Sequence, residues 1–193
     1  MRSVLIVALF LALAGCAKPP SQTKNACAIF EQRDGVFNNW RREANKASRE
    51  YGIPVSILMA TIYTESGFRH NARPPRRKLL GFIPWKRQST AFGYSQALDG
   101  TWERYKRETG RGLARRTDFG DAVRFIAWYH YQSHRRNNIA LSDPYNLYLA
   151  YHSGHEGFKR GAYRGRPEAL NGAKRFTNIS YTYARQLKDC SNY

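Results

Sequence analysis

The chain has 193 residues, enough for one domain with a sizeable core and hardly enough for two. Its 42% hydrophobic content excludes a wholly disordered chain, and 32 Lys and Arg against 14 Asp and Glu give a formal charge of +18, which attracts polyanions such as nucleic acid, anionic lipid or acidic wall polymers. No apolar run reaches the ~18 residues of a transmembrane helix, and the absence of P-loop, zinc-protease, α/β-hydrolase and CxxC motifs argues against those classes.

The first fifteen residues predict an export signal. A basic start at Arg2 precedes a short apolar run, and the segment ends in Leu13-Ala14-Gly15-Cys16. This ending resembles the lipobox of bacterial lipoproteins, which implies acylation of Cys16 and anchoring to a membrane that the chain does not span. If the cell is Gram-negative, Ala17 after the cysteine favours the periplasmic face of the outer membrane. The alternative is an ordinary secretory signal with a chance cysteine.

Residues 16–26 hold two prolines, polar residues and no apolar periodicity, so we predict a tether there and one domain over residues 27–193. Cys27 and Cys190 lie at the two ends of that domain. Because export leads to an oxidising compartment and domain termini often lie close in space, we expect these two cysteines to pair. Two unpaired thiols are the alternative.

The body of the chain predicts a mainly α domain, to which a short β-hairpin between Arg73 and Phe92 can be added. Convincing alternating strands are scarce elsewhere, and no internal repeat is found. The helix signals, in chain order, are an entry at Pro54 with a stop at Gly67, a cap at Asp99 with an end at Gly110, a cap at Asp118, a segment from Asp143-Pro144 to Gly154, and a C-terminal helix with apolar residues from Phe176 to Leu187.

Glu65 is unusual because it lies on the apolar stripe of its own predicted helix, seven residues after Leu58 and three after Ile62. Burial and the negative end of the helix dipole both raise the pKa of a carboxyl group placed there. An acid that stays protonated near neutral pH is what cleavage of a glycosidic bond requires. The alternative is that Glu65 turns outward at the helix end and meets an arginine.

Three blocks resemble the soluble lytic transglycosylase family, which is related to goose-type lysozyme. Thr64-Glu65-Ser66-Gly67-Phe68 resembles its catalytic E-S-x-F motif, and residues 91–96 followed by 100–102 resemble its G-x-x-Q…G-T-W segment. Residues 149–154, which read LAYHSG, resemble its A-Y-N-x-G block. The three occur in the family's order over roughly residues 40–187, and the resemblance implies a lysozyme-like single domain.

The resemblance implies a role for each matching residue. Glu65 falls on the catalytic acid/base, and Ser66 on the residue that supports it and the sugar by hydrogen bonding. Gln96 falls on a glutamine of the saccharide groove, and Tyr151 on a tyrosine close to the catalytic carboxyl. Tyr94, where the family usually has leucine, is expected to be a substrate contact of altered character. His152 stands where asparagine is usual, which leaves its role open.

The resemblance also implies a reaction. Glu65 would protonate the bridge oxygen between MurNAc and GlcNAc of peptidoglycan and then deprotonate the MurNAc C6 hydroxyl, giving 1,6-anhydro ends without a cofactor or metal. A hydrolytic lysozyme would admit water, commonly with a second carboxylate, for which Asp99 is the nearest candidate, although a helix cap explains Asp99 better. A non-catalytic lipoprotein that binds peptidoglycan is a further alternative. Nucleic-acid binding conflicts with export, and we expect a monomer.

The segment Arg69–Gln88 contains seven Lys and Arg, no acidic residue and several large apolar side chains. It predicts either a loop that binds an anionic wall polymer or lipid surface, or a solvated basic loop whose apolar residues reach the core. His130 and His134 have a spacing that suits zinc, but no third ligand is evident, so we expect solvated or aromatic-packed histidines.

Overall fold

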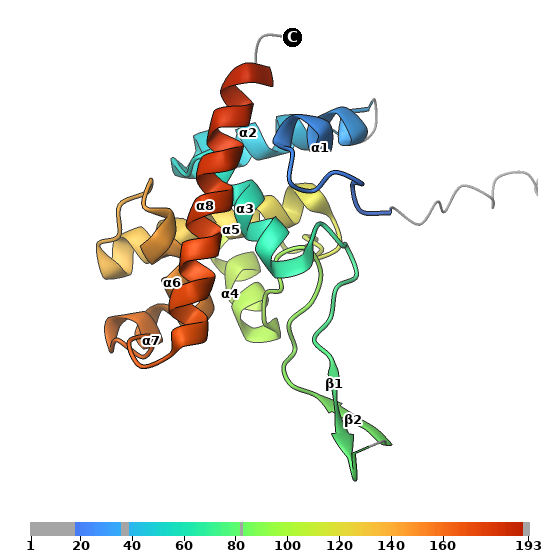
Figure 1. Ribbon diagram of the computed structural model, residues 1–193, viewed down its shortest axis with the longest axis vertical. Coiled ribbons are helices and arrows are strands. Elements are labelled where there is room, and N and C mark those ends of the chain that lie inside the picture. Colours follow the sequence, from blue (N-terminus) through green and yellow to red (C-terminus); the bar gives the residue numbers. More distant parts are fainter. Residues whose placement is uncertain (1–17, 36–38, 82, 191–193) are drawn as a thin grey trace, which may run out of the picture.

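A computed structural model describes residues 18–35, 39–81 and 83–190 of the chain. Within these residues the elements are α1 Ala26–Arg33, α2 Trp40–Tyr51, α3 Val55–Ser66, β1 Arg76–Leu79, β2 Ile83–Arg87, α4 Asp99–Thr109, α5 Phe119–Asn137, α6 Pro144–Ser153, α7 His155–Lys159 and α8 Pro167–Asp189 (Figure 1). The fold is therefore mainly α, as predicted. The predicted signal segment 1–15 and Cys16 lie outside the described residues. None of the described helices is both long enough and apolar enough to cross a bilayer.

Helix α3 is the centre of the domain. It packs against α2, α5 and α8, and every residue from Ser56 to Ile62 is buried. The sequence predicted one apolar stripe, whereas the helix is buried on nearly all sides along this stretch, as expected of a helix that is apolar all round. Gly67 ends α3 with φ of +58°, a backbone conformation that glycine adopts at little cost. Glu65 therefore lies in the last turn of a helix that is otherwise mostly buried in the core.

Local capping chemistry sets most of the helix starts. Asp118 begins α5 and Asp143 begins α6, and each carboxylate accepts a hydrogen bond from the backbone N–H three residues later. Both caps and the end of α6 at Gly154 confirm the sequence predictions.

The predicted cap at Asp99 is wrong by one residue. Leu98 occupies the cap position of α4, and Asp99 is the first helical residue. The Asp99 carboxylate forms an ion pair with Arg116 at 2.7 Å, a partner that is distant in sequence. The acidic side chain still lies in the first turn, where the helix dipole favours it.

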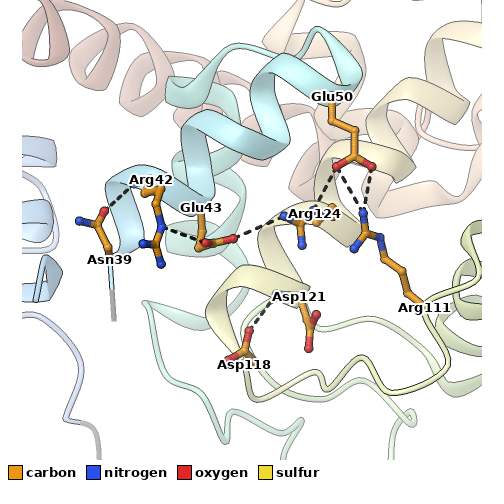
Figure 2. Close-up of polar contacts among 8 residues, drawn as sticks. All are labelled: Asn39, Arg42, Glu43, Glu50, Arg111, Asp118, Asp121 and Arg124. Atoms are coloured by element: carbon orange, nitrogen blue, oxygen red, sulfur yellow. Dashed lines mark hydrogen bonds and ion pairs between the residues drawn. The ribbon is translucent and has the colours of Figure 1, made fainter. Parts of the chain in front are cut away.

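An ion-pair network ties α2 to α5 (Figure 2). Arg124 of α5 is 6% exposed, and its guanidinium contacts Glu43 at 3.4 Å and Glu50 at 3.1 Å. Arg111 reaches Glu50 from the loop after α4 at 3.3 Å. A buried guanidinium is stable only when it is paired, so these contacts account for the burial of Arg124 and fix the register of the two helices.

The ends of the domain are joined covalently. Cys27 of α1 and Cys190, which caps the end of α8, form a disulfide with their Cα atoms 5.7 Å apart, as predicted from export and chain ends. The tyrosine hydroxyl of Tyr183 donates to the Thr23 carbonyl, and the Ala26 N–H donates to the side-chain oxygen of Gln186 at 2.9 Å. The packed chain therefore begins a few residues before the boundary predicted at residue 27.

The short hairpin predicted between Arg73 and Phe92 is present. Strands β1 and β2 are antiparallel, with Arg76 opposite Arg87 and Leu79 opposite Ile83. Figure 1 shows the hairpin extending away from the helices as a separate arm. Two large apolar side chains on it face solvent, Leu80 with 76% of its surface exposed and Trp85 with 52%. These two side chains therefore do not reach the core, contrary to the alternative in which the apolar residues of this segment pack there.

Candidate active site

Glu65 lies in the last turn of α3 and is half-buried. Burial raises the pKa of its carboxyl group from 4.5 to about 7, and desolvation is the cause. No cation among the described residues offsets this effect, so the alternative in which Glu65 meets an arginine does not hold. A carboxyl group with this pKa is substantially protonated at neutral pH and can also act as a base.

Two tyrosines of α6 lie within electrostatic reach of Glu65. Burial, and after it the negative charge of Glu65, raises the pKa of both Tyr148 and Tyr151. The Tyr151 hydroxyl donates a hydrogen bond of 2.6 Å to the Ser95 carbonyl, which orients the phenol. Tyr148 was not singled out in the sequence, although it lies three residues before Tyr151 and so on the same helix face.

A cavity of about 260 Å³ lies beside Tyr151. Its lining comes from the loop at residues 96–98, from Thr101 of α4, from Phe125 and Tyr129 of α5, and from residues 151–154. Gln96 and Tyr151, which the sequence pattern assigned to one site, both line it. Glu65 does not line this cavity, and Tyr151 is the residue that both lines it and senses the charge of Glu65. We call this cavity the groove.

Gln96 has a backbone φ of +50° and uses its amide to hold the loop. Its Nε2 donates to the carbonyl oxygens of Ala72 at 2.9 Å and Gly93 at 2.8 Å. Both N–H groups are thereby used, and the side-chain oxygen is left to accept a hydrogen bond from a ligand in the groove. A Cβ on Gly93 would lie 2.1 Å from the Arg116 carbonyl oxygen, so only glycine fits this close approach.

Tyr94 does not lie in the groove. It is 4% exposed, and its ring packs edge-on against Trp40 at 5.6 Å and Phe119 at 5.9 Å. This placement in the aromatic core does not support its expected contact with substrate. A tyrosine there completes a buried cluster, which explains why this chain accepts an aromatic residue at that position.

Ser66 also lies away from the expected contacts. It is 1% exposed, and its hydroxyl donates to the Ile62 carbonyl one turn earlier at 3.0 Å. The hydroxyl is therefore used within α3, and the expected hydrogen bond to Glu65 is not formed in this structure.

A buried histidine, His130, packs against Tyr151. The ring of His130 is fully buried and lies 5.3 Å from that of Tyr151, and its Nε2 lies 2.9 Å from the Thr61 hydroxyl. Since the Thr61 hydroxyl donates to the Ile57 carbonyl, Nε2 of His130 donates to Thr61. Burial lowers the pKa of His130 to about 3, so the ring is neutral. The described residues contain no cluster of three or more His, Cys, Asp or Glu suited to a metal ion.

The sequence matches a known protein-family model. A family model described as a transglycosylase SLT domain matches residues 4–190 of the chain. No curated protein matches the chain. The matched span contains Glu65 and the groove residues Gln96 and Tyr151.

Proposed function

The chain belongs to the transglycosylase SLT domain family, and from this premise we propose that it cleaves the β-1,4 bond between MurNAc and GlcNAc in peptidoglycan, with Glu65 as its acid/base. The observation that carries the proposal is the raised pKa of Glu65, about 7, at a position within electrostatic reach of a groove residue, Tyr151. An isolated surface glutamate would be ionised at neutral pH and could not protonate a leaving oxygen.

The reaction uses this single carboxyl group twice. Protonated Glu65 gives its proton to the glycosidic oxygen as the bond to the MurNAc anomeric carbon breaks. The Glu65 carboxylate then takes the proton from the C6 hydroxyl of the same MurNAc, and that oxygen bonds to the anomeric carbon to form a 1,6-anhydro ring. The proton balance closes on Glu65, and the substrate's own N-acetyl group assists, so no second protein nucleophile is required.

The other residues position the substrate and the acid. The Tyr151 hydroxyl donates a hydrogen bond to the Ser95 carbonyl, and its raised pKa keeps the phenol protonated, so it acts as a fixed dipole near Glu65 and transfers no proton in the reaction. Gln96 offers its side-chain oxygen to a sugar N–H or hydroxyl in the groove.

Hydrolysis by a lysozyme mechanism is less well supported. The candidate second carboxylate, Asp99, is paired with Arg116 and does not line the groove. No carboxylate of the described residues lines the groove, so Glu65 has no second carboxylate there as a partner in activating water, and intramolecular attack by the C6 hydroxyl is the better fit.

We further propose that acylated Cys16 anchors the protein on the periplasmic side of the outer membrane. Pro20 is already buried against the domain, so only three residues, four Cα-to-Cα steps, would separate it from acylated Cys16. A chain of that length spans at most about 14 Å, which would hold the enzyme close to the membrane surface.

The test is digestion of purified sacculi by the wild type and by Glu65→Gln. Released muropeptides with 1,6-anhydro ends, identified by mass, support the proposal, whereas reducing ends indicate a muramidase. If the wild type releases nothing, the binding-module alternative holds. Glu31→Gln, which changes an exposed carboxylate on α1, is the matched control and should keep full activity. Wild-type activity should fall as pH rises through about 7, because the acid form of Glu65 is lost.

A further inference from the structure

A second cavity lies at the base of the hairpin. It has a volume of about 570 Å³ and is lined by residues 73, 87–90, 99 and 116. Three of these are arginines and one is an aspartate. We call it the cationic pocket. Nothing in the mechanism above uses it.

Two of its three arginines have no carboxylate partner among the described residues. Arg116 is neutralised by Asp99, as described above, and donates to the Ala97 carbonyl at 2.9 Å. Arg87 gives one hydrogen bond, of 2.7 Å, to the carbonyl of Pro74. Arg73 stacks on the ring of Phe92, with its guanidinium carbon 3.8 Å from the ring centroid. Since a guanidinium has five N–H donors, most donors of Arg73 and Arg87 are left for a ligand.

The cationic pocket adjoins the groove. Ala97 and Leu98 line the groove, and the next residue, Asp99, lines the cationic pocket. The Gln96 side chain donates a hydrogen bond to the carbonyl of Ala72, the residue directly before Arg73. The two cavities therefore lie on neighbouring parts of one loop, residues 96–99.

We propose that the cationic pocket binds the free carboxylates of the peptides that substitute MurNAc, so that the enzyme distinguishes acidic, peptide-bearing glycan strands from neutral ones. This inference rests on the proposed function, because it takes the groove to hold a glycan strand. The sugars themselves carry hydroxyl and amide groups, which do not need two uncompensated guanidinium groups. A carboxylate suits such groups, because it carries a negative charge and accepts paired N–H donors from an arginine in bidentate geometry.

The test measures binding of soluble glycan strands to the full chain carrying Glu65→Gln, so that the strands are not cut. The strands are used in three forms: with free peptide carboxylates, with the same carboxylates converted to amides, and with the peptides removed so that only the lactyl carboxylate remains. We expect the free form to bind about tenfold more tightly than the amidated form. The stripped form distinguishes the two sources of carboxylate, because tight binding of stripped strands would overturn the assignment to the peptide.

Substitution of the two unpaired arginines should remove the preference. Arg73→Gln with Arg87→Gln should weaken binding of the free form about tenfold or more and change binding of the amidated form less than twofold. Arg73→Gln alone keeps the hydrogen bond of Arg87 to the Pro74 carbonyl, loses only the stacking of Arg73 on Phe92, and should show the same trend. The control pair, Arg107→Gln with Arg135→Gln, removes the same charge from exposed positions that line neither cavity.

Two failures can be told apart. Equal binding of free and amidated strands, or equal loss with both forms in the arginine variants, overturns the pocket assignment even if the wild type cleaves sacculi. A wild type that cleaves no sacculi overturns the proposed function, and the binding comparison then still decides whether the pocket selects carboxylates.

Discussion

Glu65→Gln should make the protein more stable, by an amount that grows with pH. In the wild type, the folded state holds the carboxyl at a pKa of about 7, against 4.5 for a free side chain. Ionising it therefore costs more in the folded than in the unfolded state. Below pH 4.5 the group is protonated in both states and contributes no penalty. As pH rises from about 4.5 to about 7, the unfolded state loses its proton first and the wild type loses stability.

The magnitude follows from the pKa difference. A difference of about 2.5 pH units at about 1.4 kcal/mol each gives a penalty of about 3 kcal/mol above pH 7. Since the side chain keeps partial contact with solvent, this value is an upper limit. Glutamine has the same shape and no charge, so the variant should escape the penalty. For a domain of this size, about 3 kcal/mol corresponds to a rise in Tm of about 6–12 °C.

The assay is denaturant unfolding of both proteins, with the disulfide intact, at unit intervals from pH 4 to pH 8. Only the pH dependence of the difference in unfolding free energy matters, because any fixed effect of the glutamine cancels and other titrating groups contribute equally to both proteins. Glu31→Gln, at an exposed position on α1, is the control for the removal of one carboxylate. If the Glu65→Gln difference is also flat between pH 4 and pH 8, the carboxyl is not desolvated and the catalytic argument fails.

Three other predictions test different parts of the structure. Tyr151→Phe should reduce kcat about tenfold or more with a small effect on KM, because the bond to the Ser95 carbonyl that orients the ring beside Glu65 is lost; a KM effect alone would instead indicate a sugar contact. Cys27→Ser with Cys190→Ser should lower the unfolding free energy by up to about 5 kcal/mol, measured by urea unfolding, because the bridge closes a loop of 163 residues. Trp85 emission should shift to shorter wavelength with anionic vesicles and not with zwitterionic ones if the hairpin meets a lipid surface; a shift with neither vesicle refutes that contact.

Helix boundaries could be predicted where the deciding interaction is local. Asp118 and Asp143 cap helices through backbone groups three residues away, and the glycine after Ser66 ends α3 by its own conformation. Asp99 has the same local pattern, yet its carboxylate forms an ion pair with Arg116. The cap of α4 is Leu98, one residue before the position that the pattern predicts. A tertiary partner of this kind leaves no signal within the helix itself.

The same distinction between local and distant interactions applies to the residues of the site. The placement of Glu65 at the inner end of an apolar helix could be predicted, because it depends on spacing within one helix, and burial then raises its pKa. The fates of Ser66 and Tyr94 could not be predicted. The hydroxyl of Ser66 has a carbonyl of its own helix within reach, and Tyr94 completes an aromatic cluster whose members come from separate parts of the sequence. A motif identifies which residues gather at a site, but not which way each side chain turns.

Gln96 shows that a residue assigned to a groove by its motif can also hold the fold together. Its two N–H groups are spent on the Ala72 and Gly93 carbonyls, which lie on either side of the hairpin segment in the sequence. One amide thus closes the base of the hairpin and sets Arg73 next to the groove. Because an amide is planar and its two donors are fixed relative to its acceptor, the same contacts that hold the hairpin also aim the remaining oxygen. The loop that lines the groove and the base of the hairpin, where the cationic pocket lies, are therefore joined through one side chain.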